Sequence, residues 1–167
     1  MLIKKELADK MIEQVGNEFG AAAQYLAIAV YFEQEAMENT ASFFYTQSEE
    51  ERQHGLKLLK YVVDAGGEVN IPAVPAPKMK IDSAEDAFQM SLNWELEVTG
   101  QINGLMDLAR QQNDYMAQNF LNWFVNEQLE EVTTMEKYLG LVRKMGDRNL
   151  FYLENLIAHP EAAGGAE

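Results

Sequence analysis

The chain of 167 residues suits a single domain with a substantial core, and its lack of cysteine excludes disulfides, zinc–thiolate sites and thiol catalysis. Because His54 and His159 are the only histidines, any metal site must rest mostly on oxygen ligands, which favour hard or borderline cations over copper and zinc. The formal net charge of −14 argues against nucleic acid and anionic membranes as partners, and the lack of an apolar run long enough for a membrane helix or signal peptide leads us to expect a cytoplasmic protein.

Between two breaks rich in glycine and proline, the apolar residues recur at three- and four-residue steps, which indicates amphipathic helices. The first predicted helix covers about residues 5–37, and its apolar stripe is Met11, Val15, Phe19, Ala22, Leu26 and Val30. The second covers about residues 40–65, with Phe44, Leu58 and Val62 on its stripe.

The second half of the chain repeats this pattern. Ser83 and Asp86 have the spacing of a capping box and open a third helix, whose stripe is Phe88, Leu92, Val98, Ile102 and Leu105. A fourth helix spans about residues 115–145, with Gly146 as its C-terminal cap and a stripe of Leu121, Phe124, Met135, Tyr138 and Val142. Asp147 can cap a short fifth helix that reaches Ala158, and residues 159–167 are expected to form a disordered tail.

The connections predict how these helices pack. Only a few residues join the first helix to the second and the third to the fourth, so each pair should be an antiparallel hairpin. The segment Gly67–Asp82 is kept extended by Pro72, Pro75 and Pro77 and can span on the order of 50 Å, whereas a 26-residue helix is only about 39 Å long. This segment can therefore cross the whole bundle, which makes the third helix parallel to the second.

Every long helix also carries polar residues on its apolar stripe, where solvated charge does not belong. They are Glu18 and Tyr25 in the first helix, Gln47, Glu51 and His54 in the second, Glu95 in the third, and Gln128 and Glu131 in the fourth. A buried carboxylate must be paired, protonated or bound to a metal, because an unpaired charge in a core is very unfavourable. These stripes offer no lysine or arginine, and Arg52 lies one step off, so a metal is the remaining partner.

The heights of these residues along the bundle agree, so that Glu18, Glu51, His54, Glu95, Gln128 and Glu131 can converge on one layer. One carboxylate from each of two helices, with an i, i+3 pair from each of the others, is the arrangement known from ferritin-like di-metal proteins, and we recognise it as theirs. Glu51 and His54 share a helix face, which allows Glu51 to bridge two metals while His54 holds one.

Over about residues 5–158 the chain resembles the ferritin family. The similarity is most specific at residues 120–131 (FLNWFVNEQLEE), and it extends to residues 17–25 (NEFGAAAQY), 49–54 (EEERQH) and 93–99 (NWELEVT). It implies an all-α, ferritin-like four-helix bundle with a long crossover between helices two and three and a short fifth C-terminal helix. The di-iron domain would cover residues 1–158, and twenty-four copies would form a shell that stores ferric mineral.

The resemblance also implies a role for each site residue. The first iron would be held by Glu18, Glu51 and His54, and the second by Glu51, Glu95 and Glu131. Gln128 would lie beside the second iron, and Tyr25 would orient Glu95.

A third iron position is predicted on one flank of this pair, at Glu50, Glu127 and Glu130 with help from Glu131. Glu50, Glu127 and Glu130 each lie one position before a residue of the layer in the sequence. A difference of one position turns a side chain by about 100° around its helix. If the second and fourth helices are antiparallel neighbours, these turns bring the carboxylates to the same flank. Microbial non-haem ferritins look similar here.

Haem-containing bacterioferritins differ from this chain at two places. They carry a second Glu-x-x-His on the fourth helix, where this sequence has Gln128-x-x-Glu131, and a haem-ligating methionine at the position of Arg52. We therefore expect the non-haem bacterial type, with no haem.

The expected function is that of a ferroxidase: two Fe(II) ions bind in the bundle, O2 or H2O2 takes their electrons, and the ferric product moves to the shell cavity. One alternative is a di-iron oxidase or peroxidase acting on another substrate, which would need an apolar substrate cavity. The other is a non-catalytic acidic helical scaffold, whose core would have no reason to hold four carboxylates.

Overall fold

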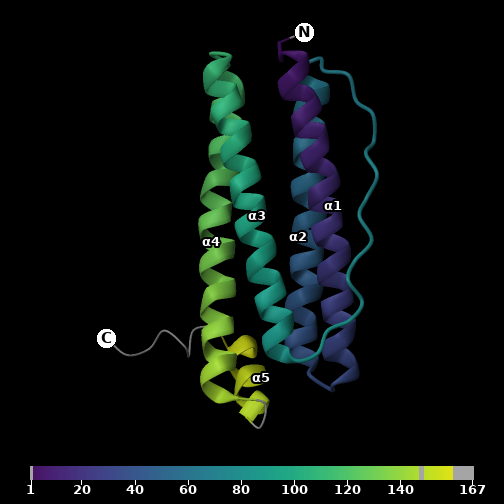
Figure 1. Ribbon diagram of the computed structural model, residues 1–167, viewed down its shortest axis with the longest axis vertical. Helices are drawn as coiled ribbons and strands as arrows, with labels where there is room; N and C mark the ends of the chain where they lie inside the picture. Colours follow the sequence, from purple (N-terminus) through teal and green to yellow (C-terminus); the bar gives the residue numbers. More distant parts are fainter. Residues whose placement is uncertain (1, 147–148, 160–167) are drawn as a thin grey trace, which may run out of the picture.

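The computed structural model describes residues 2–146 and 149–159, and in these ranges every regular element is an α-helix. The helices are α1 (Lys5–Gln34), α2 (Glu38–Asp64), α3 (Ala84–Gln111), α4 (Tyr115–Met145) and α5 (Leu150–Ala158). Four long helices lie side by side, and the short α5 lies at one end of the bundle (Figure 1). The predicted all-α bundle with a short fifth helix is confirmed. None of the described helices is long and apolar enough to cross a membrane.

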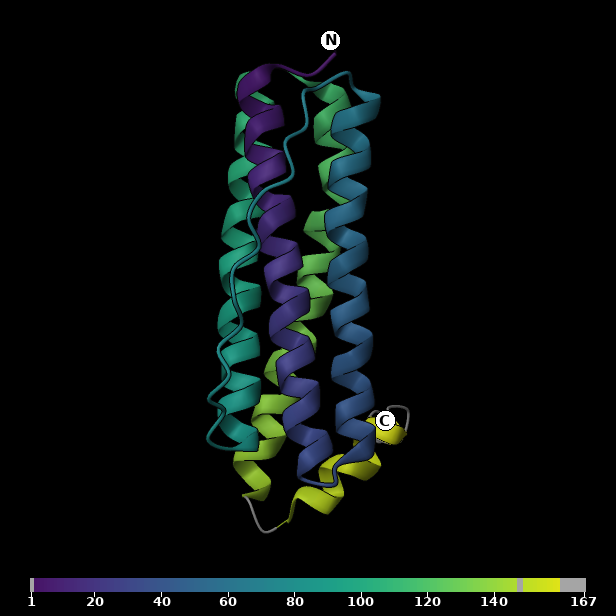
Figure 2. The ribbon, with the colours of Figure 1, turned by 90° about the vertical axis from the view of Figure 1, so that its right-hand side faces the viewer.

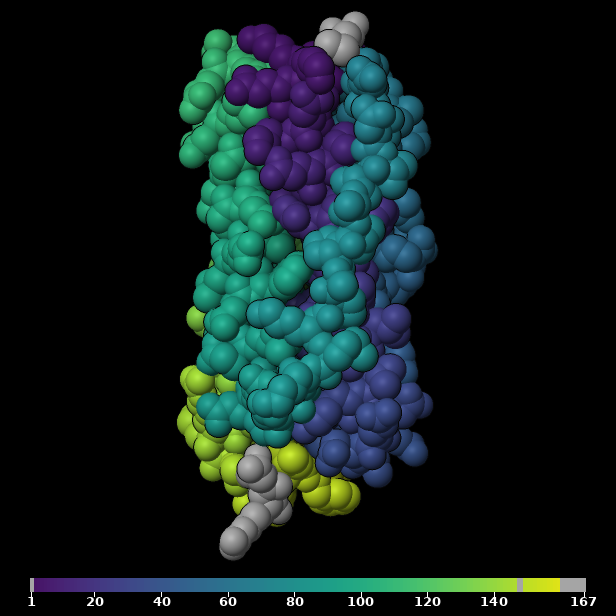
Figure 3. Space-filling view, turned by 45° about the vertical axis from the view of Figure 1, so that its right-hand side comes forward, coloured from purple at the N-terminus to yellow at the C-terminus, as the bar shows by residue number. Residues whose placement is uncertain are grey.

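The segment between α2 and α3 runs along the whole bundle, so that α2 and α3 point the same way, as predicted (Figure 2). It packs on α1 where two glycines leave room: a Cβ atom at Gly16 would lie 3.1 Å from the Cγ of Pro72, and one at Gly20 would lie 2.9 Å from the Cγ of Pro75. One turn further, the side chain of Gln24 pairs with both backbone groups of Lys78, at 2.7 and 3.1 Å. Figure 3 shows the crossover lying over α1 along the bundle surface.

The helix ends follow local capping rules where the sequence supplies a cap. Ser83 accepts a hydrogen bond from the N–H of Asp86 at 3.1 Å, and Asp114 accepts one from the N–H of Ala117 at 2.9 Å. Gly146 ends α4 with a φ of 65°, a conformation that favours glycine. The predicted cap Asp147 lies outside the described residues, as do residues 160–167 of the predicted tail.

The first helix is shorter than predicted, and its predicted apolar stripe includes two residues that are exposed. It ends at Gln34, because the chain turns through Ala36, which has a φ of 59°. Leu26 and Val30 are 48% and 38% exposed, while their neighbours Tyr25, Ile28, Ala29 and Phe32 are buried. The predicted stripe advanced by more than 3.6 residues per turn on average, so it drifted around the helix away from the core.

The apolar core consists of two clusters separated by a polar layer. One cluster holds Val15, Leu58, Val98 and Phe124 among its members, and the other holds Tyr25, Phe44, Leu92 and Met135. In each long helix the polar residues of the predicted site fall between these two sets. The layer therefore interrupts the core near the middle of the bundle.

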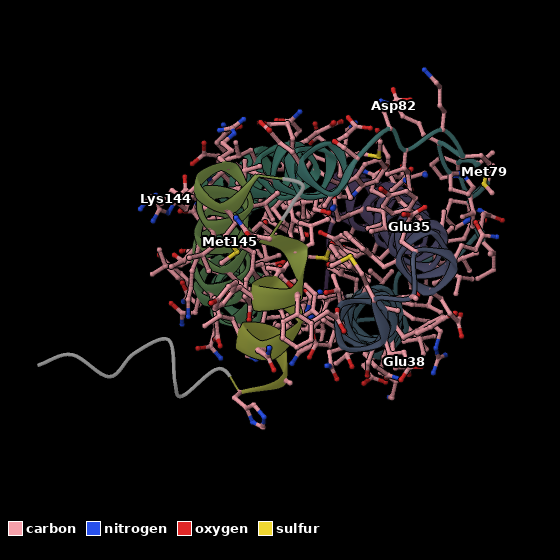
Figure 4. All side chains as sticks on the ribbon, turned by 90° about the horizontal axis from the view of Figure 1, so that it is seen from below. Glu35, Glu38, Met79, Asp82, Lys144 and Met145 are labelled. Carbon is pink, nitrogen blue, oxygen red and sulfur yellow. The ribbon has the colours of Figure 1, made fainter. Side chains whose placement is uncertain are left out.

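The helix α5 closes one end of the bundle. Seen along the bundle axis from that end, α5 crosses between α4 and α2 (Figure 4). Leu153 is buried in the adjacent core cluster. The carboxylate of Glu154 accepts hydrogen bonds from the first N–H groups of α2, at Asn39 (2.9 Å) and Thr40 (2.8 Å). Because no side chain of its own caps α2, this contact between distant segments supplies the cap.

Candidate metal centre

Six residues from all four long helices form the polar layer, and each is at most 6% exposed. They are Glu18 from α1, Glu51 and His54 from α2, Glu95 from α3, and Gln128 and Glu131 from α4. Every one of them was expected to reach this layer from its position on an apolar stripe. Gln47, also expected on the α2 stripe, is only half-buried and turns to Glu50 instead.

The carboxylates and the histidine form two three-ligand groups that share one residue. Ligand atoms of Glu18, Glu51 and His54 all lie within 4.8 Å of one another, and the same holds for Glu51, Glu95 and Glu131. The Nδ1 atom of His54 is 3.5 Å from an oxygen of Glu51 and 3.7 Å from one of Glu131. Glu51 therefore lies where it can bridge two cations.

Hydrogen bonds orient several of these ligands. The hydroxyl of Tyr25 donates to Glu95. The amide nitrogen of Gln128 donates to Glu131 at 2.5 Å and lies 3.4 Å from Glu95, while its oxygen accepts from the hydroxyl of Thr99 at 2.8 Å. Glu95 and Glu131 are thus each held by a neighbouring donor.

Burial decides the electrostatics of the layer. Desolvation raises the pKa of all four carboxylates, Glu18, Glu51, Glu95 and Glu131, above the ordinary value of 4.5. At Glu51 the charges of the other three carboxylates raise the pKa further. Desolvation and the charge of Lys57 lower the pKa of His54 to about 4, so the imidazole is neutral and free to bind a metal. Among the described residues, no lysine or arginine forms an ion pair with these carboxylates.

Two buried oxygen atoms, Oε2 of Glu18 and Oε2 of Glu51, have no hydrogen-bond partner. Burying an acceptor oxygen without a hydrogen-bond partner lowers the stability of the fold, unless a cation or a proton binds to that oxygen. The donor set of carboxylate oxygens with one imidazole nitrogen suits iron in both oxidation states better than it suits copper or calcium. The side chains of this layer are therefore suitable ligands for Fe(II).

The flank where a third position was predicted is arranged differently from the expectation. Among the described residues, the third metal-competent group joins Glu127 to His54 and Glu131, and Glu50 and Glu130 belong to none of the groups. Glu50 and Glu130 are exposed, although the charges of Glu127 and Glu130, after desolvation, raise the pKa of Glu50. The four carboxylates share a flank, but Glu50 and Glu130 would have to rotate to reach the metal position.

A surface cavity of about 550 Å³ opens on this flank, lined by residues that include Glu50, His54 and Glu127. The ammonium of Lys57 lies there over the ring of Trp123, 3.4 Å from its centroid. The side chain of Lys57 therefore contributes a positive charge to the lining of this cavity.

Arg52, at the position of the bacterioferritin methionine, is exposed and forms an ion pair with Glu49 at 2.8 Å. Its exposure agrees with its position one step off the apolar stripe. The expectation of no haem remains a prediction.

Sequence reasoning missed three residues that act around the layer: Gln14, Lys57 and Thr99. Gln14 donates to Glu18 four residues later, at 3.0 Å. Thr99 follows Glu95 by four residues and Lys57 follows His54 by three, so all three share a helix face with a candidate ligand. A search at i±3 and i±4 from each candidate ligand could have found them.

Known proteins provide a further comparison. A model of the family described as the ferritin-like domain matches residues 8–145. Ferritin BfrB of Mycobacterium tuberculosis is 39% identical over 166 residues, covering 93% of this chain and 91% of that protein. The bacterial non-heme ferritin of Staphylococcus aureus is 39% identical over 153 residues, covering 91% and 92%. Among solved structures, the open pore ferritin of the archaeon Archaeoglobus fulgidus superimposes with a TM-score of 0.91 at 29% identity, covering 95% of this chain and 98% of that one.

Proposed function

The chain belongs to the ferritin family, and on that premise we propose that it oxidises Fe(II) in the polar layer and stores the ferric product inside a shell of its own copies. Family membership supports iron storage as the broad function. The observation that supports the oxidation site is the pair of three-ligand groups sharing Glu51, with orphaned oxygens on Glu18 and Glu51.

In this proposal iron is the substrate, and the chain holds two Fe(II) ions close together. Glu18 and His54 bind one ion, Glu95 and Glu131 bind the other, and Glu51 bridges them. The two ions supply the two electrons that reduce O2 to H2O2, or H2O2 to water. Binding of a cation displaces the protons that burial holds on these carboxylates, because a metal compensates the charge that the apolar surroundings do not.

Tyr25 and Gln128 act on the ligands of the second ion. The Tyr25 hydroxyl donates to Glu95 and the Gln128 amide donates to Glu131, so each carboxylate keeps an oxygen directed at the metal position. Such outer partners fix the ligand orientation.

The di-iron oxidase alternative has less support from the cavities. An apolar groove of about 410 Å³ between α3 and α4 reaches Gln128, but neither Glu95 nor Glu131 lines it. An organic substrate in this groove would not touch the carboxylates, whereas Fe(II) itself fits between them.

The test is the oxidation of added Fe(II), followed by absorbance in a stopped-flow instrument, in Glu51→Ala and His54→Ala variants. We expect the initial rate to fall by at least about tenfold in each, because each variant removes a ligand of the first group. Glu136→Ala, on the exposed side of α4, is the matched control and should oxidise iron as the wild type does. Wild-type rates in both ligand variants would contradict the site.

We also propose a third iron position on the flank, formed by Glu127 with Glu50, Glu130 and Glu131. The support is the shared flank and the cavity that opens there. Soaking crystals with Fe(II) should show a third metal beside the pair, and Glu130→Ala should change the ratio of iron oxidised to O2 consumed. An unchanged ratio would remove any function from this position.

A further inference from the structure

A chain of three amide side chains connects the solvent-facing side of the α1–α3 contact to the polar layer. Gln14 and Asn17 lie on α1, and Gln101 faces them from α3, the neighbouring helix in Figure 2. Asn17 donates from one nitrogen to Gln101 at 3.1 Å and to Gln14 at 3.2 Å. Gln14 in turn donates to Oε1 of Glu18 at 3.0 Å. We call Gln14, Asn17 and Gln101 the amide relay.

The hydrogen-bond directions in the relay are set by its ends. When a metal is bound, Glu18 is ionised and can only accept, so Gln14 must present its nitrogen to that carboxylate. The oxygen of Gln14 then faces Asn17, which must present its nitrogen in turn, and the same nitrogen satisfies the oxygen of Gln101. A flip of either α1 amide would place two oxygens against each other, so the relay has one favourable orientation.

The relay leaves Glu18 with two unlike oxygens. Oε1 is occupied by Gln14, which is itself only 3% exposed, whereas Oε2 is buried with no partner. The free oxygen belongs to a residue of the first three-ligand group, beside Glu51 and His54. The amide bond therefore selects the atom of Glu18 that remains for a metal.

Packing alone does not explain the polar character of the relay. A cavity of about 340 Å³ lies beside it, lined by all three amides and by Leu105 and Leu108 of α3. Apolar side chains already contribute to that wall, so an apolar residue at position 14 would suit the α1–α3 contact. A buried amide there is useful because it donates to a carboxylate.

From these contacts we propose that Gln14 is a positioning residue for the iron reaction: held by Asn17 and Gln101, it fixes Glu18 so that only Oε2 binds the first Fe(II). This rests on the proposed function, since it concerns the same site. Without the relay, the metal itself must order the Glu18 side chain as it binds, which weakens binding.

The test compares Gln14→Leu with Gln111→Leu, a matched change at an exposed position near the end of α3. Co(II) is the probe, because it is far harder to oxidise than Fe(II) and its visible absorption reports the ligand geometry. Titration should show the affinity of the first Co(II) lowered by about tenfold in Gln14→Leu and unchanged in Gln111→Leu, since a hydrogen bond to a charged ligand is lost only in the former. The KM for Fe(II) should rise with it, while kcat changes less.

A purely structural role would instead change the melting temperature and leave Co(II) affinity alone. Wild-type Co(II) affinity and KM in Gln14→Leu would therefore overturn the proposal. If that variant does not fold, Asn17→Leu replaces it; we expect a loss of about threefold, and wild-type affinity would overturn the proposal equally.

Failure of the relay and failure of the proposed function give different results. If the wild type neither binds Co(II) in the bundle nor oxidises Fe(II), both proposals are wrong. If the wild type does both, Glu51→Ala does neither, and Gln14→Leu matches the wild type, only the relay is wrong.

Discussion

At the residue scale, the buried carboxylates of the polar layer lower the stability of the metal-free fold and provide ligands for a metal. Four carboxylates meet in a space from which water is excluded, and burial raises the pKa of each. A group with a raised pKa in the folded state stabilises the fold below its unfolded pKa, and this contribution is lost as pH rises through the folded value. His54 has the opposite sign: its pKa falls from 6.5 to about 4, so stability is gained as pH rises between those values.

We therefore expect the metal-free protein to lose thermal stability as pH rises from about 6 to about 8, because the unfolded chain has released these protons while burial raises the pKa of Glu95 to about 7 and that of Glu131 to about 10 in the folded state. Calorimetry in a chelator would measure this, at about 0.5 M NaCl to screen the repulsion of the acidic surface. Addition of Co(II) should reverse the slope. A melting temperature that is flat or rises over this range without metal would contradict the assigned pKa directions.

The same reasoning predicts that Glu51→Gln stabilises the metal-free protein. The amide keeps the shape of the side chain, cannot ionise, and can donate to Glu18, so unfolding at about pH 8 should cost about 1–3 kcal/mol more than in the wild type. Metal binding should be lost at the same time, because the shared ligand is gone. A lower melting temperature for Glu51→Gln in chelator would show that the layer is not strained by its charges.

At the scale of the elements, the bundle depends on a contact between its last helix, α5, and the start of α2. Glu154 of α5 accepts from the backbone N–H groups of Asn39 and Thr40 at the start of α2, and the N-cap residue Met37 makes no side-chain cap of its own. Loss of a helix cap typically costs about 1–2 kcal/mol, so Glu154→Ala should lower the free energy of unfolding by that amount. Glu154→Gln retains one acceptor oxygen and should lose less. Chemical denaturation followed by circular dichroism would measure both, and equal stability of Glu154→Ala and the wild type would contradict the tertiary cap.

The turns between helices carry a second prediction at this scale. Ala36 and Asn113 both have positive φ, at 59° and 55°, in the two hairpin connections. This conformation costs an alanine about 1–2 kcal/mol, and the greater unfolded freedom of glycine offsets about 0.5–1 kcal/mol, so Ala36→Gly should stabilise the fold by about 0.5 kcal/mol. Asn113→Gly is the matched change, and it should gain less because asparagine tolerates this region. A destabilised Ala36→Gly would mean that the Ala36 side chain contributes packing that outweighs the backbone strain.

At the scale of the whole molecule, the polar layer splits the core into two apolar clusters. Large apolar side chains remain on the outside, among them Leu26 and Val30 on α1 and Leu96 and Leu129 near the α3–α4 groove. Exposed apolar surface of this extent is typical of a subunit that buries it against other copies.

We expect light scattering of the purified protein to give roughly 450 kDa, the mass of twenty-four chains of 18.9 kDa. Iron analysis of the same fraction should find many more iron atoms than the two or three that the ligand groups of each chain can hold. A dimer with two irons per chain would contradict storage in a shell and leave only the oxidation site.

Much of this molecule could be predicted from the order of its residues. Local spacing determines which residues share a helix face, so the buried positions of Glu18, Glu51, His54, Glu95, Gln128 and Glu131 follow from each helix separately. The lengths of the connections determine the helix directions, because a three-residue turn permits only a hairpin and the proline-rich crossover can span the bundle.

The contacts between residues of different helices could be learned only from the tertiary structure, because they depend on the distances between the helices. Small errors in period accumulate along a helix, which is why the stripe through Leu26 and Val30 was wrong although Glu18, nearer its middle, is buried. Side-chain reach across a bundle depends on rotamers and interhelical spacing, which no sequence period encodes, and for this reason Glu127 groups with His54 rather than with Glu50 and Glu130. The cap of α2 by Glu154 and the contact of Gln101 with Asn17 join residues 84 or more positions apart, so they exist only once the helices have packed.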